Sequence, residues 1–290
     1  MFLEMIAGQL ARVCGDTLTH LDEQRAAAAN RGMAEALQRS LLREPVQPDH
    51  LEIAVRYLPA VSEAEIGGDW YDAFLCQDGA TWLVVCDVAG HDQTAAAVMA
   101  EIRNLLRGIA YTLQSSPAAV LTAADAAMAG LGVRSLTTVV AVRIEQNADD
   151  EAVGVRRVRW ANAGHPAPLL LRADGAVEAL DTPAETLLGV RPDTVRTDHE
   201  TVLSPGEGLL LYTDGLIERR DRDLDQAGQW LLAETRNWTA APLDALCDHL
   251  LATVAGHADD DIVLLALRAH PQNGARPIEA GPQQRPATLA

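Results

Sequence analysis

An apolar run that ends in an aspartate constrains this chain more than any other feature. Residues 83–86 read as a buried strand, Asp87 follows directly, and after the turn at Gly90 a small-residue stretch typical of a helix begins at Thr94. An isolated buried carboxylate is costly, so the charge of Asp87 needs compensation. We expect metal ions to compensate it, with further acids elsewhere in the chain as the other ligands.

The period of the apolar residues divides the chain into three parts. Residues 1–44 have helical spacing, residues 48–268 alternate between short strands and helices, and residues 269–290 carry four prolines and few bulky apolar groups. We therefore expect a helical segment, one α+β domain with sheet packed on sheet, and a disordered tail. The expected strands are 51–57, 66–74, 81–87, 136–144, 153–161, 168–172, 177–180, 209–212 and 262–267, and the expected helices are 93–113, 117–130, 224–238 and 242–255.

The N-terminal helical segment needs a partner for its apolar stripe. It could pack on its own domain or form a coiled-coil-like homodimer, and the sequence leaves both open. Pro45 and Pro48 end the helical pattern. A segment of this length is too short for a typical sensory module, so the chain could also be a fragment of a longer protein.

Bulk composition excludes several classes of function. A net charge of −18 argues against nucleic acid as a partner, because phosphate backbones require a basic surface. We also expect no membrane span, since no apolar run approaches about 18 residues. The N-terminus lacks a basic region typical of a signal peptide, and four scattered cysteines fit reduced thiols, so we expect a cytoplasmic protein.

Four acids share the context of an apolar strand that meets a turn. Asp69 follows two glycines, Asp87 and Asp214 follow apolar strands, and the cluster at residues 259–261 precedes the last strand. The Asp78–Gly79 turn predicts a hairpin that brings Asp69 close to Asp87. Each aspartate alone could simply cap a helix or start a turn.

Convergence of these acids would favour divalent metals. Two carboxylates about 4 Å apart repel by roughly 4 kcal/mol at an effective dielectric near 20, so a cluster of four requires neutralisation. Hard oxygen ligands favour Mg²⁺ or Mn²⁺ over zinc. Paired metals activate water and clamp phosphate oxygens, so the expected reaction is phosphate ester hydrolysis.

Five short motifs together resemble a known family. They are Ile66–Asp72 (IGGDWYD), Asp87–His91 (DVAGH), Asn162–Pro166 (NAGHP), Tyr212–Leu216 (YTDGL) and Asp260–Ile262 (DDI). In this order they are similar to the SpoIIE-like branch of the metal-dependent serine/threonine protein phosphatases, the PPM family. The resemblance covers about residues 48–268.

The resemblance implies a sandwich of two antiparallel β-sheets flanked by helices, with two Mn²⁺ or Mg²⁺ ions at one end. By motif match, Asp87 would bridge both metals and the Val88 carbonyl would join one of them. Asp69, Asp214 and Asp260 would be the remaining ligands, with Asp87 and Asp214 essential for catalysis. A hydroxide bridging the metals would attack phosphoserine or phosphothreonine directly.

The resemblance also implies a partner, a phosphorylated STAS-domain anti-sigma-factor antagonist, and regulation through the helical pair at residues 93–130. The sequence departs from the family pattern at Ala89, Asp92 and Val263. Ala89 replaces a histidine that acts as general acid in many eukaryotic relatives. The alternatives are a catalytically silent phosphoprotein-binding module, motivated by Asp92 and Val263, and a small-molecule phosphatase using the same metals.

Overall fold

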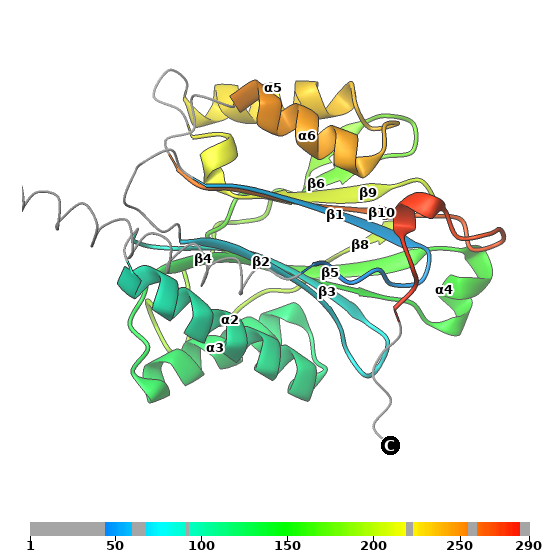
Figure 1. Ribbon diagram of the computed structural model, residues 1–290. Coiled ribbons are helices and arrows are strands. Elements are labelled where there is room, and N and C mark those ends of the chain that lie inside the picture. Colours follow the sequence, from blue (N-terminus) through cyan, green and yellow to red (C-terminus); the bar gives the residue numbers. More distant parts are fainter. Residues whose placement is uncertain (1–43, 60–67, 91–92, 219–222, 255–259, 285–290) are drawn as a thin grey trace, which may run out of the picture.

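Two antiparallel sheets face each other, and helices cover both outer faces (Figure 1). The structure is a computed structural model that describes residues 44–59, 68–90, 93–218, 223–254 and 260–284. The fold class predicted from the sequence is confirmed.

Each sheet has five strands, and every strand pair is antiparallel. The first sheet has the order β1 (Leu51–Leu58), β10 (Ile262–Ala269), β9 (Gly208–Tyr212), β6 (Leu169–Leu171) and β7 (Val177–Ala179). The second has the order β2 (Asp69–Leu75), β3 (Thr81–Val88), β4 (Thr137–Glu145), β5 (Arg156–Ala163) and β8 (His199–Leu203).

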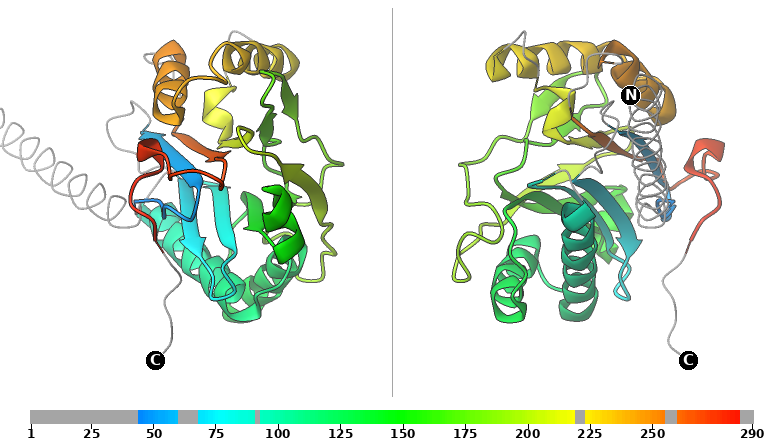
Figure 2. Two further views of the ribbon diagram at one scale, coloured as in Figure 1. Left: turned by 90° about the vertical axis from the view of Figure 1, so that its right-hand side faces the viewer. Right: turned by 60° about the vertical axis from the view of Figure 1, so that its left-hand side comes forward.

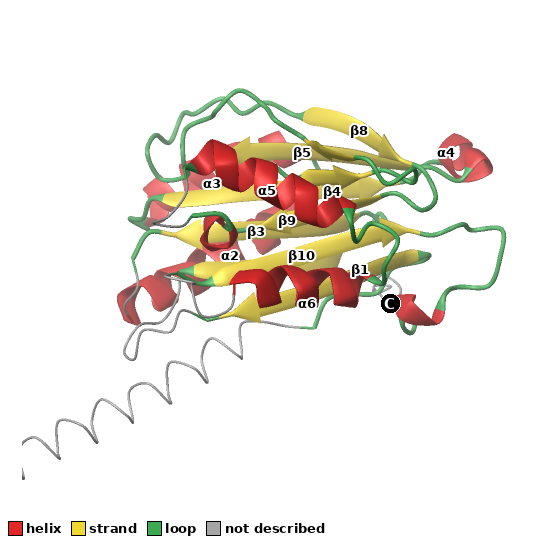
Figure 3. Cartoon of the chain, turned by 90° about the horizontal axis from the view of Figure 1, so that it is seen from above, coloured by secondary structure: helices red, strands yellow, loops and turns green. Residues whose placement is uncertain are grey.

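Two pairs of helices enclose the sandwich from opposite sides (Figure 2). Helices α2 (Gln93–Leu113) and α3 (Pro117–Leu131) pack on the second sheet, and α5 (Leu224–Arg236) and α6 (Leu243–Val254) pack on the first. Seen from above, α6 lies along β1 and β10 (Figure 3). The short elements are α4 (Ala148–Val153), η1 (Asp214–Leu216) and η2 (Ile278–Ala280).

Alternation of side chains along the strands builds three apolar layers. Along β3, Leu83 and Val85 point into the layer between the sheets, whereas Trp82 and Val84 point toward α2 and α3. The third layer joins the first sheet to α5 and α6. The layer between the sheets ends at the two ends of the sandwich, and Asp69 and Asp87 lie at one of them.

The predicted hairpin is confirmed. Strands β2 and β3 pair through the turn at Gln77–Ala80, in which the Asp78 side chain accepts a hydrogen bond from the backbone of Ala80 at 3.1 Å. The register places Asp69 opposite Asp87.

Two local predictions were wrong. The polar segment at residues 145–151, expected to be a turn, contains the start of α4, which Asn147 and Asp150 stabilise as a reciprocal capping box. Strand β8 was not predicted, because only its last residue, Leu203, is buried. Its other side chains alternate between partly buried and exposed, so the strand lacks a clear apolar pattern.

Residues 270–284 belong to the tail that the sequence predicts to be disordered, and that prediction stays untested, but the structure describes contacts between this segment and the start of β1. Arg276 donates hydrogen bonds to the carbonyl oxygens of Pro48 and Leu51, and the backbone of Gln284 donates to Gln47 at 2.8 Å. Ala280 is fully buried. A composition poor in apolar residues did not reveal these contacts to main-chain carbonyls.

Residues 1–43 lie outside the described residues, so the predicted N-terminal helix and its possible role in dimerisation stay predictions. The described part of the chain contains no helix that combines the length and the apolar character needed to cross a bilayer.

Candidate metal centre

Strands β2 and β3 bring the first two acids together. Asp69 opens β2, Asp87 lies near the end of β3, and the two are register partners in the antiparallel pair. Directly paired residues project to the same face, which here is the inter-sheet face of Tyr71 and Val85. Asp69 is buried and Asp87 is partly buried at the end of the apolar layer.

The first sheet contributes acids to the same end. Strand β9 ends at Tyr212, and Asp214 opens the single turn η1 that follows it. The hydroxyl oxygen of Thr213 accepts a hydrogen bond from the Val263 backbone at 2.9 Å, which ties the end of β9 to β10. The acids at Asp260 and Asp261 immediately precede β10.

Electrostatic coupling shows that these acids converge. Burial, and then the charge of Asp87, raise the pKa of Asp69 well above its usual value, although a hydrogen bond from the Thr213 side chain opposes the rise. Burial, and then the charges of Asp214 and Asp260, raise the pKa of Asp87 to about 7. The pKa of Asp214 is also raised, by burial and by Asp260. The register confirms that Asp69 and Asp87 meet, whereas the gathering of all four acids into one metal site stays a prediction, which this coupling supports.

Two glycines allow the close approaches that the centre needs. A Cβ on Gly68 would lie 2.1 Å from the Val88 carbonyl oxygen and 3.2 Å from Asp87 Oδ1. A Cβ on Gly215 would lie 2.2 Å from the Asp261 carbonyl oxygen. Real side chains cannot make such contacts, so glycine is required at both positions. The Val88 carbonyl oxygen and Asp87 Oδ1 consequently border the same small space beside Gly68.

The two neighbouring acids before β10 have different environments. Asp260 is exposed, and its Oδ1 accepts a hydrogen bond from the Asp261 backbone at 2.8 Å. Asp261 is buried, and its Oδ2 accepts a hydrogen bond from the Tyr57 hydroxyl at 2.6 Å. The resemblance assigned Asp260 to the metals, and sequence reasoning placed Asp261 only within the acidic cluster 259–261 and gave no role to Tyr57. The alternating pattern of β1 placed Tyr57 on a half-buried strand, but nothing in it indicated this contact.

His165 links the two sheets beside the acids. Its Nε2 lies 3.1 Å from the Tyr212 carbonyl oxygen, which can only accept, so Nε2 carries the hydrogen. Nδ1 then accepts from the Thr138 hydroxyl at 2.8 Å, and Thr138 is the register partner of Asp87 on β4. Burial lowers the pKa of His165 to about 3, which keeps the ring neutral. The Asn162 side chain holds the His165 backbone through two hydrogen bonds of 2.7 and 2.8 Å.

Other residues of the matched motifs lie away from the acids or outside the described residues. Asp72 is buried on the helix side of β2, where it pairs with Arg107 at 2.7 Å and Arg103 at 3.4 Å. Val263 is fully buried in the inter-sheet layer, so this departure from the family pattern is a packing position. His91 and Asp92 lie outside the described residues.

The residues present fit divalent cations chemically. Asp69 Oδ2 is buried and has no hydrogen-bond partner among the residues that the structure describes, and such an atom is costly unless another group compensates it. Hard oxygen atoms surround it, as Mg²⁺ and Mn²⁺ prefer. Among the described residues, no three carboxylate, histidine or cysteine side chains are grouped closely enough to hold a metal by themselves. The ligand assignments of Asp69, Asp87, Val88, Asp214 and Asp260 therefore stay proposals.

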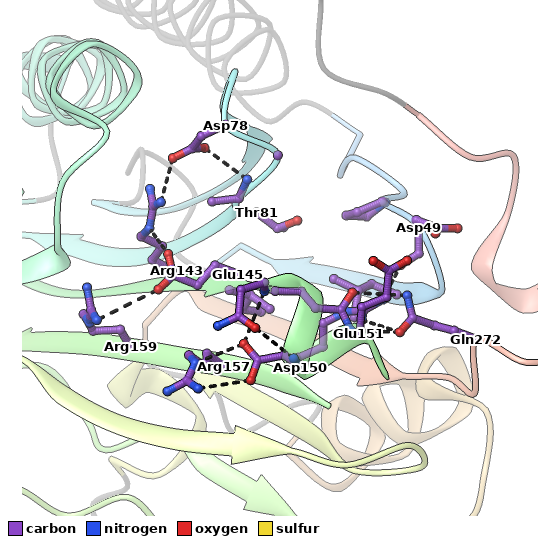
Figure 4. A pocket seen from close by; sticks show the side chains of 18 residues that line it. Asp49, Asp78, Thr81, Arg143, Glu145, Asp150, Glu151, Arg157, Arg159 and Gln272 are labelled. Carbon is purple, nitrogen blue, oxygen red and sulfur yellow. Dashed lines mark hydrogen bonds and ion pairs between the residues drawn. The ribbon is translucent and has the colours of Figure 1, made fainter. Parts of the chain in front are cut away.

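A cavity of about 600 Å³ lies at the opposite end of the sandwich, between the β2–β3 turn and α4. Three of the five acids that line it are paired with arginines: Asp78 and Glu145 bind Arg143, and Asp150 binds Arg157 (Figure 4). The charges of those three carboxylates are therefore already neutralised, unlike the charges of the acids at the other end of the sandwich. We therefore place the candidate site at the acids.

Comparison with known proteins gives the family. The family model described as Stage II sporulation protein E (SpoIIE) matches residues 77–270. This chain belongs to the SpoIIE family. Two curated relatives of this SpoIIE-family chain are Protein IcfG of Synechocystis sp., 26% identical over 227 residues, and Phosphoserine phosphatase RsbP of Bacillus subtilis, 23% identical over 239 residues. The matches cover 70% and 79% of this chain, but only 36% and 55% of the relatives.

Solved structures share the fold. The RsbU and RsbW domains of Rv1364c from Mycobacterium tuberculosis match with a TM-score of 0.67 at 31% identity, over 78% of this chain and 62% of that one. The SiaA-PP2C domain of Pseudomonas aeruginosa matches with a TM-score of 0.65 at 22% identity, over 83% of this chain and 98% of that one. The catalytic domain of the phosphatase PstP, solved with two manganese ions, matches with a TM-score of 0.53 at 18% identity, over 76% and 98%. The SpoIIE-family chain thus has the fold of PP2C-type phosphatase domains.

Proposed function

We propose that this SpoIIE-family domain is a metal-dependent protein-serine/threonine phosphatase. The observation that carries the proposal is the convergence of Asp69, Asp87 and Asp214 from two sheets onto one end of the sandwich, where burial and mutual repulsion raise the pKa of each. Such a cluster is stable as a set of carboxylates only with compensating cations.

Two divalent cations, Mn²⁺ or Mg²⁺, would supply an activated water and neutralise the phosphate charge. Asp87 would hold both ions, the Val88 carbonyl would join one, and Asp69, Asp214 and Asp260 would complete the set. His165 would keep Thr138 and Tyr212, and with them the two sheets, in place around the ligands. With Ala89 in place of a histidine, the chain offers no side chain at that position to protonate the leaving group.

We further propose that the substrate is phosphoserine or phosphothreonine on a regulatory STAS-domain protein, an anti-sigma-factor antagonist. Support comes from the relative named Phosphoserine phosphatase RsbP and from the 31% identity to a protein with RsbU and RsbW domains. Turnover of a phosphorylated STAS-domain protein should far exceed turnover of sugar or nucleotide phosphates. Equal or higher activity on the small phosphates would favour a small-molecule phosphatase instead.

The activity is tested with p-nitrophenyl phosphate in the presence of Mn²⁺, Mg²⁺ or EDTA. We expect metal-dependent turnover, and a loss of more than about 100-fold in Asp87→Asn, because even residues that only support metal ligands are worth roughly 10–100-fold. Asp193→Asn, at an exposed loop position, is the control and should retain activity. Failure of the unmodified chain to turn over substrate with either metal would refute the enzyme and favour a silent phosphoprotein-binding module.

Metal binding is measured separately from turnover. Millimolar Mn²⁺ should raise the melting temperature, since a ligand at about 100 times its Kd stabilises the native state by about 2.7 kcal/mol. Asp87→Asn should lose most of this shift while still folding. A melting curve that is the same in Mn²⁺ and EDTA would contradict the metal centre.

A further inference from the structure

A second cavity, of about 520 Å³, opens at the same end of the sandwich as the acids. The C-terminal turn of α3 and residues 132–136, which lead into β4, form one wall, and the loop from Gly189 to Pro192 forms the other. Met128, Val133 and Leu136 give the lining a largely apolar character. Nothing in the metal chemistry requires such a cavity.

Large apolar side chains are unusually exposed around this cavity. Leu136, which lines the cavity, is 49% exposed, and the sequence neighbours of other lining residues include the exposed Leu131, before Gly132, and Val190, after Gly189. Single exposed leucines are ordinary, but a cluster around a cavity marks a binding surface.

The cavity is held in shape from beneath. Asp125 on α3 accepts hydrogen bonds from the Gly189 backbone at 2.9 Å and from Arg196 Nη2 at 2.6 Å. Arg196 also donates to the carbonyl oxygens of Thr186 and Leu187. These contacts fix the loop against α3, and binding cavities are usually largely pre-formed in this way.

The cavity adjoins the candidate catalytic centre through β4. Thr138 on β4 is the register partner of Asp87, and Leu136 lies two residues before it, about 7 Å along the strand. The Leu136 carbonyl oxygen accepts a hydrogen bond from the Ala89 backbone at 2.9 Å, in the turn that follows Val88. A polypeptide whose phosphoresidue lies at the acids can therefore extend over this cavity.

A basic side chain lies at the rim. Arg134 lines the cavity, is exposed, and forms no ion pair with any residue that the structure describes. The chain has a net charge of −18 and gathers acids at this end, so an unpaired guanidinium here would favour the approach of a phosphorylated substrate.

We propose that this cavity is a substrate subsite that binds an apolar side chain located within a few residues of the phosphoserine or phosphothreonine. The proposal rests on the proposed phosphatase function and gives it sequence selectivity. Met128 and Val133 would receive the side chain, Leu131 and Leu136 would cover it, and Arg134 would face the acidic part of the substrate.

The test uses synthetic phosphoserine peptides with a host sequence of alanine and serine, in which one leucine is moved from position −4 to +4. We expect leucine at one or two neighbouring positions to raise kcat/KM by roughly 10-fold or more, as a well-filled apolar pocket does. Turnover of p-nitrophenyl phosphate is measured in parallel. No turnover of that compound would refute the phosphatase function itself, whereas turnover without any leucine preference would refute only the subsite.

Variants locate the preference within the molecule. The ratio of kcat/KM between the best leucine peptide and the host peptide should fall toward 1 in Leu131→Ser and Leu136→Ser. This ratio is internal to each variant, so a change in overall activity does not obscure it. Leu113→Ser and Val153→Ser, which remove comparably exposed apolar side chains elsewhere, should keep the full ratio.

Two outcomes would overturn the assignment. An undiminished ratio in both Leu131→Ser and Leu136→Ser would place the selectivity elsewhere. A change of Leu131→Ser from dimer to monomer in gel filtration, with the ratio unchanged, would mean that a second copy of the chain covers this surface.

Discussion

Removal of the Asp125 carboxylate should destabilise this domain more than removal of any exposed acid. Asp125 and Arg196 are both completely buried, and their side chains meet through two hydrogen bonds of 2.6 and 3.2 Å. The residues are 71 positions apart, and the pair joins α3 to the loop that borders the 520 Å³ cavity. Asp125→Ala removes the closer counter-charge of the buried Arg196 guanidinium and leaves only Glu185, whose Oε2 lies 3.9 Å from Nη1.

The expected loss in the free energy of unfolding follows from the polar groups that lose their partner in Asp125→Ala. Breaking a buried ion pair by removing one partner costs about 3–5 kcal/mol, and the Gly189 N–H also loses its acceptor. For an m-value of about 2 kcal/mol/M, this corresponds to a fall in the urea midpoint of roughly 1.5–2.5 M. The double variant Asp125→Leu/Arg196→Met should recover most of this loss, because a well-packed apolar pair avoids the cost of burying charge.

The assay is urea unfolding followed by circular dichroism, with Asp248→Ala as the matched control. Asp248 also binds an arginine through two hydrogen bonds, but its side chain is exposed. Exposed ion pairs of this kind contribute only about 0–1 kcal/mol to the free energy of unfolding. An Asp125→Ala midpoint within error of the Asp248→Ala midpoint would refute the reasoning. A double variant less stable than Asp125→Ala would show that the burial of an uncompensated charge is not the main cause of the loss in stability.

Three further outcomes are expected. Gly68→Ala should abolish the Mn²⁺-dependent rise in melting temperature, because its Cβ would collide with the Val88 carbonyl, whereas Gly228→Ala, with open space around it, should leave the rise intact. His165→Ala should cost about 1–3 kcal/mol in urea unfolding and weaken Mn²⁺ binding in calorimetry, since it removes a hydrogen bond to the buried Tyr212 carbonyl and one to the partly buried Thr138 hydroxyl. In EDTA the raised pKa of Asp87, about 7 against an ordinary 3.8, means that its protonated form stabilises the fold at low pH and that this contribution is lost as the pH rises through 7. The metal-free melting temperature should therefore fall between pH 5.5 and 8, and by less in Asp87→Asn; an equal fall in both would contradict this.

The sequence predicted the part of the site that depends on local pattern. The apolar run of β3 and the Asp78–Gly79 turn were sufficient to predict that Asp69 lies close to Asp87, because antiparallel register follows from turn position. The small-residue run that begins at Thr94 likewise led to the prediction of a helix over 93–113, the bounds that α2 has in the structure.

Contacts between distant segments could not be predicted in this way. The Tyr57–Asp261 hydrogen bond joins residues 204 positions apart, and no local pattern specifies such a pair. Strand β8 has polar and partly exposed residues because it is an edge strand, so its apolar signal is weak. Asn147 and Asp150 did carry a capping signal for α4, which the polar composition of that segment concealed.

The segment after β10 contacts one edge of the first sheet. Strand β1 is an edge of that sheet, and open edges invite strands from other molecules to pair with them. Arg276 and Gln284 already occupy main-chain carbonyls at and just before the start of this edge. A polypeptide ending at Ala269 would retain the whole sandwich and every acid of the centre, yet part of its edge would lie open, and light scattering should show it associating at lower concentration than the full chain. We therefore expect the segment to hinder the pairing of β1 with a strand of another molecule.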